Sequence, residues 1–366
     1  MRVTRVSARD FRNLERVEAA LGDAVTVVHG PNGAGKTNLL EAVYFGCTAR
    51  SCRTSNEREL VRFGAKVARV ELDVAAEDGP HRIEVGFEPG DAKRVRVDGA
   101  PVAGPVGTEV RPLVSVFMPD RLDLVKGAPA LRRAHLDQLV TALWPARAAN
   151  RAAYSRALAQ RNALIARVRA GAAGPALLDT WDAELARAGV ELMADRRETC
   201  SLVAPRFAAR AVDLGLPDEA TLRYRPRSRA EDEEGLRSEL AERREDDIAR
   251  GFSAHGPHRD EVLLAHAGRP LRAYGSQGQQ RLGLLALLFA ERDVLMDARG
   301  QPPLMLLDDV MSELDQVRRE RLVELLGSGG QAIITTTDLE HVPGAGDGAV
   351  TALPVMSGHV AQEPVA

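Results

Sequence analysis

The spacing of apolar residues divides the chain into three regions. In residues 2–111, apolar positions alternate with polar ones or form short runs, which predicts β-strands bounded by Gly, Pro and Asp. The predicted strands are residues 3–9, 24–29, 67–76, 82–88 and 94–98. Leu40, Val43 and Tyr44 recur instead at helical spacing, so we expect a helix after the second strand.

Between about residues 119 and 251 the apolar spacing becomes helical. One apolar series ends at residues 171–175, which contain two glycines and a proline, and a second series follows them. The apolar positions are Tyr154, Leu158, Ile165 and Val168 in the first series, and Leu177, Trp181, Leu185, Ala188 and Leu192 in the second. This pattern predicts a short antiparallel helical arm. We expect its arginines, among them Arg156 and Arg161, to form a solvated surface.

The alternation of strands and helices returns from about residue 253. The predicted elements are strands at 261–265, 303–307 and 332–336 and helices at 278–294 and 314–326, with a loosely ordered segment from residue 344 onward. The fold class is therefore α/β, with one head interrupted by an inserted lobe. We expect residues 1–118 and 252–366 to form the head and residues 119–251 to form the helical lobe.

Composition and charge narrow the class of protein. With 366 residues, 45% of them apolar and 28% charged, the chain can bury a large core and is expected to form two soluble lobes. The net charge of −3 argues against a uniformly basic surface, so a nucleic-acid site would need a local patch or a groove shared between subunits. No signal core and no membrane-length apolar stretch occur, which predicts a cytoplasmic protein without a membrane partner.

Residues 30–37 read GPNGAGKT and lie between a predicted strand and a predicted helix. In a P-loop of this pattern, backbone N–H groups and the helix N-terminus cradle a polyphosphate. Lys36 would reach the β- and γ-phosphates of ATP, and the Thr37 hydroxyl would hold Mg²⁺. The predicted phosphate-binding residues are Gly30, Asn32, Gly33, Ala34, Gly35, Lys36, Thr37 and Asn38.

Asp308 and Asp309 follow an apolar run at residues 304–307. A carboxylate at the end of a buried strand is costly unless it faces a cation or a cleft, and the Mg²⁺ on Thr37 is a natural partner for Asp308. Asp309 stands where γ-phosphate hydrolysis needs a residue that orients water or accepts its proton. Asp309 and Lys36 are therefore the predicted catalytic residues. Aspartate is shorter than the glutamate common in such ATPases, so slow turnover is expected.

Ser276 precedes the apolar helix predicted at 278–294, and two roles for it stay open. One is a simple N-cap. The other is an anion site, because a serine hydroxyl and free N–H groups at a helix start suit a γ-phosphate. Since the P-loop already surrounds one side of that phosphate, a second copy of the chain would supply this site in trans.

The P-loop is accompanied by motifs at residues 274–281 (YGSQGQQR), 307–310 (LDDV) and 312–315 (SELD). Together they resemble the Walker A, signature, Walker B and D-loop motifs of ABC-type ATPases. Other patterns resemble, more narrowly, the RecF family of recombination proteins. These are FRN at 11–13, RSCRT at 50–54, ELVRFG at 59–64, FMPD at 117–120, KG at 126–127, RR at 132–133 and GPHRD at 256–260. The resemblance extends to about residue 338.

The resemblance implies an ABC-type ATPase head, with a mixed β-sheet and flanking helices, and an arm too short for the long coiled coil of SMC proteins. It also implies a DNA-repair ATPase that dimerises around two ATP molecules, binds duplex DNA beside single-stranded gaps, and helps RecO and RecR to load RecA. Asp315 would lie at the dimer seam, and Arg12 and Asn13 would approach the nucleotide. The signature residues that would contact the other subunit's ATP are Ser276, Gln277, Gly278 and Gln279.

Two departures from ABC-type proteins bear on hydrolysis. No glutamine occurs before Gln138, so the usual metal-contacting glutamine is absent or displaced, and residues 117–120 are the candidate substitute. Residues 335–338, TTTD, take the place of the switch histidine of transporters. Threonine cannot perform acid–base work near neutral pH. We therefore expect a weak, DNA-stimulated ATPase whose hydrolysis resets the DNA clamp.

The sequence gives weaker evidence for DNA contacts and partners than for the nucleotide site. Arg50, Arg53, Arg132 and Arg133 are candidates, because arginine binds phosphates without reading bases, but ordinary salt bridging is an equal alternative. Two other functions stay open. One is an ABC-type ATPase subunit that drives a membrane or protein partner, against which the inserted arm argues. The other is a structural DNA-junction binder in which ATP acts only as a glue.

Overall fold

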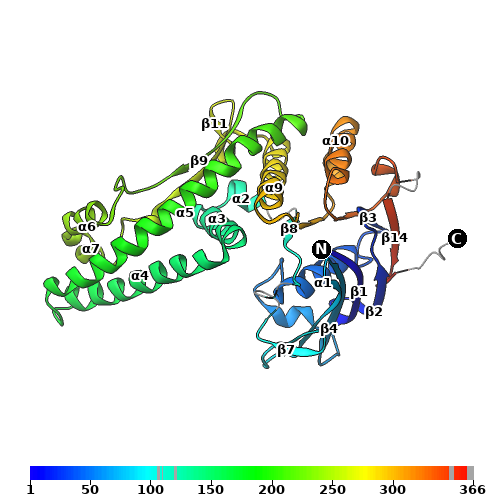
Figure 1. Cartoon of the computed structure of the whole chain (residues 1–366), viewed down its shortest axis with the longest axis horizontal. Coiled ribbons are helices and arrows are strands. Elements are labelled where there is room, and N and C mark those ends of the chain that lie inside the picture. Colours follow the sequence, from blue (N-terminus) through cyan, green and yellow to red (C-terminus); the bar gives the residue numbers. More distant parts are fainter. Residues whose placement is uncertain (105–107, 109, 119–121, 346–349, 361–366) are drawn as a thin grey trace. The chain divides into compact units, whose positions relative to one another are not determined.

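The computed structural model describes residues 1–104, 108, 110–118, 122–345 and 350–360. The chain forms two compact units: unit 1 comprises Met1–Arg121 and Leu295–Ala366, and unit 2 comprises Leu122–Val294 (Figure 1). The sequence prediction placed residues 252–294 in the head, whereas here they belong to unit 2. The reason is that β10 (Glu261–His266) pairs antiparallel with β9 (Ala220–Arg225), a contact between distant segments that apolar spacing does not reveal.

A mixed sheet in unit 1 carries the P-loop strand, in the order β15-β14-β3-β13-β12-β8. Its strands are β3 (Val25–His29), β8 (Val114–Phe117), β12 (Leu304–Leu307), β13 (Ala332–Thr336), β14 (Val350–Met356) and β15 (His359–Val360). All neighbours pair in parallel except β14 and β15. The central strands are buried on both faces, which explains their continuous apolar runs. Their parallel direction brings the ends of β3, β12 and β13 to one edge.

The expectation of a loosely ordered segment after residue 344 is wrong for residues 350–356. These residues form β14, which pairs in parallel with β3 from Val350 opposite Val25 to Pro354 opposite His29. The side chain of Val355 is fully buried in the core. Without β14, the P-loop strand would be an edge strand with unpaired backbone groups, so this segment completes the sheet.

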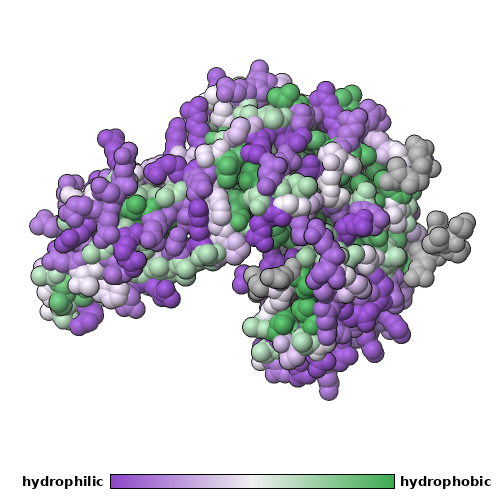
Figure 2. All heavy atoms as spheres, in the orientation of Figure 1, coloured by the Kyte–Doolittle hydropathy of each residue, from purple (hydrophilic) through white to green (hydrophobic). Residues whose placement is uncertain are grey.

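The second sheet of unit 1 is antiparallel, in the order β2-β1-β4-β5-β6-β7. Its strands are β1 (Arg2–Phe11), β2 (Leu14–Ala20), β4 (Ala68–Ala76), β5 (Gly79–Phe87), β6 (Arg94–Val97) and β7 (Ala100–Val102). Buried positions alternate with exposed or half-buried ones along β1 and β4. One face of the sheet therefore packs on the core and the other faces solvent, where hydrophilic side chains gather over β1, β2 and β4 (Figure 2).

Helix α1 (Lys36–Thr48) contacts strands of both sheets of unit 1. Its side chains Leu39 and Phe45 share one core with Leu72 of the antiparallel sheet and Leu306 of the mixed sheet. The helix that starts at the P-loop is thereby fixed on both sides. Helix α10 (Gln316–Gly327) follows β12 and leads to β13, as the sequence predicts.

Unit 2 is mainly helical. Its longer helices are α3 (Pro129–Leu143), α4 (Ala148–Arg169), α5 (Leu178–Asp213) and the greater part of α9 (Gln277–Arg299), and its shorter ones are α2 (Asp123–Lys126), α6 (Glu233–Glu242), α7 (Arg244–Arg250) and α8 (Leu271–Tyr274). Helices α4 and α5 lie side by side and form the predicted arm (Figure 1). A three-stranded sheet of β9, β10 and β11 (Arg269–Pro270) completes the unit. None of the helices described is long and apolar enough to cross a membrane.

The prediction that the arm arginines form a solvated surface is wrong for Arg161. This side chain is fully buried in unit 2. Its Nε donates to Asp182 at 2.6 Å, and its Nη1 donates to Asp247 at 2.6 Å and to the Ser253 hydroxyl at 2.8 Å. Two carboxylates compensate the buried guanidinium, so a charge that the sequence pattern places on the surface instead joins α4, α5 and α7.

Candidate nucleotide-binding site

The loop between β3 and α1 has the backbone geometry that its glycines permit. Gly33 and Gly35 have φ angles of 77° and 112°, which side chains rarely tolerate. A Cβ atom on Gly35 would lie 2.9 Å from Leu14 Cδ2, so this position also requires glycine for space. Gly35 is the N-cap of α1 and no side chain caps the helix. The first N–H groups of α1 are thus left for an anionic ligand.

Lys36 is buried at the start of α1, with 8% of its surface exposed. Its Nζ donates to the carbonyl oxygens of Gly30 at 2.8 Å and Pro31 at 3.0 Å, so the ammonium lies across the loop. Burial lowers the pKa of Lys36, and the nearby carboxylates of Asp309 and Asp308 partly oppose that shift. The residue thus keeps a partly desolvated cation at the loop, next to the two aspartates.

Thr37, Asp308 and Thr335 meet at the shared edge of β3, β12 and β13. Asp308 Oδ1 accepts hydrogen bonds from Thr37 Oγ1 at 2.8 Å and from Thr335 Oγ1 at 2.6 Å. The backbone N–H of Asp308 donates to Phe117 O at 2.9 Å. The structure therefore brings together the predicted metal ligands Thr37 and Asp308, which are 271 positions apart. Pro119 and Asp120 of the predicted glutamine substitute lie outside the described residues.

The pair Thr37 and Asp308 suits a small hard cation. Mg²⁺ prefers oxygen ligands and is usually held by one or two protein groups together with water and phosphate oxygens. A hydroxyl and a carboxylate already in contact, beside a phosphate-cradling loop, match that donor set. Among the described residues, no group of three or more His, Cys, Asp or Glu side chains is placed to hold a metal ion by itself.

Asp309 is held in a conformation that aspartate tolerates but most residues avoid, with φ at 47°. Its backbone N–H donates to Thr335 Oγ1 at 2.9 Å. Its carboxylate oxygen Oδ1 is buried and has no hydrogen-bond partner among the described groups. Buried carboxylate oxygens are normally paired, so this atom fits a site that is completed by water or ligand.

A polar network lies on one side of the P-loop. Asn13 Nδ2 donates to Gly33 O at 3.2 Å, and Asn38 Nδ2 donates to Asn13 Oδ1 at 2.7 Å. Glu41, which is fully buried, accepts two hydrogen bonds from Arg12, at 2.9 and 3.0 Å. Arg12 and Asn13 were predicted from the sequence but Glu41 was not, although a glutamate on the apolar face of α1 was a visible signal.

The signature residues lie in unit 2 at the start of α9. The backbone N–H of Gln279 donates to Ser276 Oγ at 3.3 Å, and the backbone N–H of Ser276 donates to Gln279 Oε1 at 2.8 Å. This reciprocal pair is a capping box, so the structure shows the N-cap role, one of the two roles left open for Ser276. Ser276, Gln277 and Gly278 are exposed. Asp315 is the N-cap of α10 in unit 1 and is also largely exposed.

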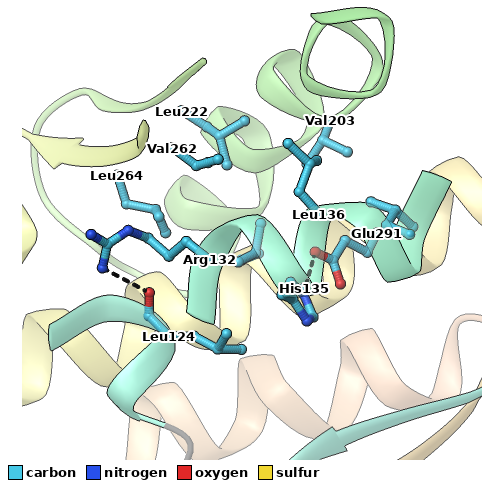
Figure 3. A pocket seen from close by; sticks show the side chains of 11 residues that line it. Leu124, Arg132, His135, Leu136, Val203, Leu222, Val262, Leu264 and Glu291 are labelled. Carbon is cyan, nitrogen blue, oxygen red and sulfur yellow. Dashed lines mark hydrogen bonds and ion pairs between the residues drawn. The ribbon is translucent and has the colours of Figure 1, made fainter. Parts of the chain in front are cut away.

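The four arginines proposed for DNA contacts differ in availability. Arg50 is exposed, whereas Arg53 donates to Asn38 Oδ1 at 2.9 Å beside the P-loop. Arg132 is buried and pairs with Glu261 through two hydrogen bonds of 2.9 and 3.0 Å, and it also donates to Leu124 O beside an apolar pocket of unit 2 (Figure 3). Arg133 donates to Asp260 O. The guanidinium of Arg132 is thus committed to the interior of unit 2.

The GPHRD stretch at 256–260 serves the interior of unit 2. Asp260 accepts hydrogen bonds from Tyr224 Oη and from Arg196 Nη1, the latter at 3.2 Å. His258 Nδ1 lies 2.8 Å from Tyr154 Oη, and burial lowers the pKa of His258 to about 4. A neutral histidine therefore links the start of α4 to this loop, and the geometry assigns the stretch to packing.

Comparisons with known proteins identify similar folds and sequences. A family model described as an AAA domain matches residues 5–117. A solved structure of the recombination mediator protein RecF with ATP, of the RecFOR pathway, has a TM-score of 0.85 and 26% identity, covering 99% of this chain and 97% of the other. An Smc head bound to a ScpA domain has a TM-score of 0.57 and 16% identity over 98% of this chain and 96% of that one, a likeness of fold alone. The predicted ABC-type head fold is confirmed.

Curated relatives extend the match to nearly the full chain. The DNA replication and repair protein RecF of Streptomyces avermitilis is 39% identical over 358 residues, which cover 94% of this chain and 95% of the relative. The protein of the same name from Anaeromyxobacter sp. strain Fw109-5 is 40% identical over 358 residues, with the same coverage. The chain therefore belongs to the RecF family of DNA replication and repair proteins.

Proposed function

We propose that this chain is an ATP-dependent DNA-binding protein of recombinational repair. The observation that carries the proposal is the contact of Thr37 with Asp308 directly behind a glycine loop whose helix has no side-chain cap. This arrangement provides N–H groups for phosphates and oxygen ligands for a cation at one place. Membership of the RecF family supports DNA as the partner.

In the ATP-bound state, the backbone from Gly30 to Thr37 surrounds the phosphates, and Lys36 shifts from the loop carbonyls to the β- and γ-phosphates. Thr37 and Asp308 would hold Mg²⁺, which neutralises phosphate charge when bound. Thr335 keeps the carboxylate of Asp308 in place. The solved RecF structure with ATP supports ATP as the nucleotide.

Asp309 is the proposed residue that orients or deprotonates the attacking water. The buried, unpaired oxygen of its carboxylate supports this role. A short aspartate, together with Thr335 where a histidine would otherwise stand, favours slow hydrolysis that DNA stimulates. Hydrolysis would then reset a DNA-bound state rather than drive continuous work.

The second half of the nucleotide site comes, in this proposal, from another copy of the chain. Ser276, Gln277 and Gly278 are exposed, which supports a contact with the γ-phosphate bound by another copy. The capping box between Ser276 and Gln279 holds this turn in place within its own chain. Asp315 would lie at the seam of the ATP-bound homodimer. The dimer would clamp duplex DNA near single-stranded gaps and, with RecO and RecR, promote the loading of RecA. The RecFOR pathway named for the similar structure supports these partners.

Fluorescence anisotropy of a labelled gapped duplex, measured against protein concentration, tests the proposal. ATP should tighten binding steeply relative to ADP or no nucleotide, and the Lys36→Met variant should lose that effect. Equal binding with and without nucleotide would overturn the ATP-dependent clamp. Absence of DNA binding would point to the alternative of an ABC-type ATPase that drives a protein or membrane partner.

A further inference from the structure

The solvent-facing side of the antiparallel sheet carries a cross-strand row of arginines. Arg9 of β1 lies directly opposite both Arg16 of β2 and Arg69 of β4. The row then continues through Gly86 of β5, which lies opposite Arg69, to Arg94 of β6. We call Arg9, Arg16, Arg69 and Arg94 the arginine row. They come from four strands, so only the register of the sheet brings them together.

The arginine row is exposed and largely unpaired. All four residues are exposed, and the Arg9 side chain retains 68% of its accessible surface. Among the residues that the structure describes, no carboxylate lies within 4.0 Å of Arg16, Arg69 or Arg94. Arg9 Nε is 3.8 Å from Asp10, whose carboxylate also accepts a 2.9 Å hydrogen bond from Arg62. The row therefore offers guanidinium groups that the fold does not use.

The fold gains nothing from this arrangement. Like charges directly opposite each other on neighbouring strands are destabilising. Another row on the same face shows the arrangement that favours folding: Asp73 lies between Arg5 and Arg82 and accepts from their Nε atoms at 2.6 and 2.8 Å. The sheet thus pairs its charges in the Asp73 row and leaves the guanidinium groups of the arginine row available to an anionic ligand.

An acidic row borders the basic surface on one side. The neighbouring row on this face contains Ser7 opposite Glu18 and Glu71, and Glu71 opposite Glu84, and it ends at Arg96 opposite Glu84. Residues two apart along a strand are separated by about 7 Å, so the acidic row runs alongside the arginine row at that distance. Carboxylates therefore border the arginine row on one side. A linear polyanion fits this pattern better than a broad acidic protein surface does.

We propose that the arginine row binds the phosphate backbone of duplex DNA. Strands in a sheet lie about 4.8 Å apart, so the four steps from β2 to β6 span roughly 19 Å. Along one DNA strand the phosphates rise about 3.4 Å each, so this length of helix axis carries some five of them, and the row can contact those that face the sheet. Arginine contacts of this kind fix position without reading sequence. This inference rests on the proposed function and gives it a surface that only the register of the sheet assembles.

The test compares two double variants of the full chain with equal charge change. Arg9→Gln with Arg69→Gln removes two members of the arginine row. Arg2→Gln with Arg82→Gln removes two arginines of the same sheet that have carboxylate partners, at 3.0 and 2.8 Å. Binding of a labelled duplex in the presence of ATP is measured over a series of salt concentrations, and ATP hydrolysis without DNA serves as a check that the head is intact.

The row variant should bind duplex DNA roughly tenfold or more weakly, and the slope of log affinity against log salt should fall by about two, one for each lost phosphate contact. The control variant should retain nearly the wild-type slope. If both variants bind alike, the arginine row is not the DNA surface, although the proposed function stands. If the wild-type chain itself binds no duplex, the proposed function and this inference fail together.

A third variant is expected to bind duplex DNA more tightly than the wild-type chain does. Glu71→Gln removes a carboxylate from the acidic row next to Arg69 without touching the arginines. Duplex binding should become tighter, by about threefold at low salt, because repulsion of the phosphates decreases. Unchanged or weaker binding would contradict a DNA strand lying along the arginine row.

Discussion

At the scale of single residues, one threonine hydroxyl holds both aspartates of the candidate site. Thr335 Oγ1 donates to Asp308 Oδ1 at 2.6 Å and accepts the backbone N–H of Asp309 at 2.9 Å. It thus fixes the carboxylate proposed to support Mg²⁺ and the backbone that positions the proposed water-orienting group. Groups that orient metal ligands in this way commonly change metal affinity or activity by about 10- to 100-fold.

We therefore predict that Thr335→Val lowers ATP hydrolysis by roughly tenfold or more and raises the Mg²⁺ concentration needed for half-maximal rate. Valine has nearly the same shape but can neither donate to Asp308 nor accept from Asp309. Thr335→Ser keeps the hydroxyl and should retain most of the activity. Steady-state hydrolysis measured across Mg²⁺ concentrations separates the variants, and a valine variant with the wild-type Mg²⁺ response would contradict the role.

A site residue could be predicted from the sequence when its signal lies in a short stretch of neighbouring residues. Lys36 and Thr37 belong to one short motif, and Asp308 ends an apolar run, so all three residues could be identified without knowing the fold. Thr335 could not, because its role depends on the parallel pairing of β12 with β13, where Leu307 lies opposite Ile334. The sequence identified residues 335–338 only as a place where a histidine is missing.

At the scale of elements, charges inside unit 2 join the helices of the arm. Arg161 of α4 binds Asp182 of α5 and Asp247 of α7, all three buried. Arg244 adds a 2.6 Å hydrogen bond to Asp182. Removal of one partner from such a group leaves an uncompensated charge in the interior, which typically costs about 3–5 kcal/mol.

Arg161→Ala should therefore lower the free energy of unfolding by about 3–5 kcal/mol, with a clear drop in the thermal midpoint. Arg156→Ala is the matched control, because Arg156 is exposed on the same helix and should change stability by less than about 0.5 kcal/mol. Thermal unfolding followed by circular dichroism compares the two. Equal effects of both substitutions would mean that the buried network contributes no more than an exposed arginine.

Helices and strands could be predicted where the spacing of apolar residues determines them. They could not be predicted where strand pairing between segments distant in the sequence determines them. The helix after the P-loop and strand β13 appear where the apolar pattern places them. Strand β14 was missed because Pro354 interrupts the apolar run of residues 350–356, and a proline argues against a strand inside a sheet. The pairing with β3 nevertheless orders the segment. The arginine row has the same cause: Arg9 and Arg69 look like unrelated surface residues until the sheet register places them opposite each other.

At the scale of the whole molecule, the proposed ATP site needs two copies of the chain. The P-loop and Asp308 belong to unit 1, whereas the exposed signature turn belongs to unit 2. In a symmetric dimer, each nucleotide would lie between the P-loop of one copy and Ser276 of the other. This arrangement makes a prediction that no single-chain site can satisfy.

Two inactive variants should restore one another when mixed. Lys36→Met disables the P-loop and Ser276→Arg obstructs the signature turn, so each variant alone should lack ATP-dependent DNA binding and hydrolysis. A mixed dimer joins the intact P-loop of the second variant to the intact signature of the first, which leaves one working site in two. Random pairing of equal amounts should therefore recover up to about a quarter of the wild-type hydrolysis rate. No recovery, with both variants folded and ATP still bound by Ser276→Arg, would show that the sites do not act across the dimer.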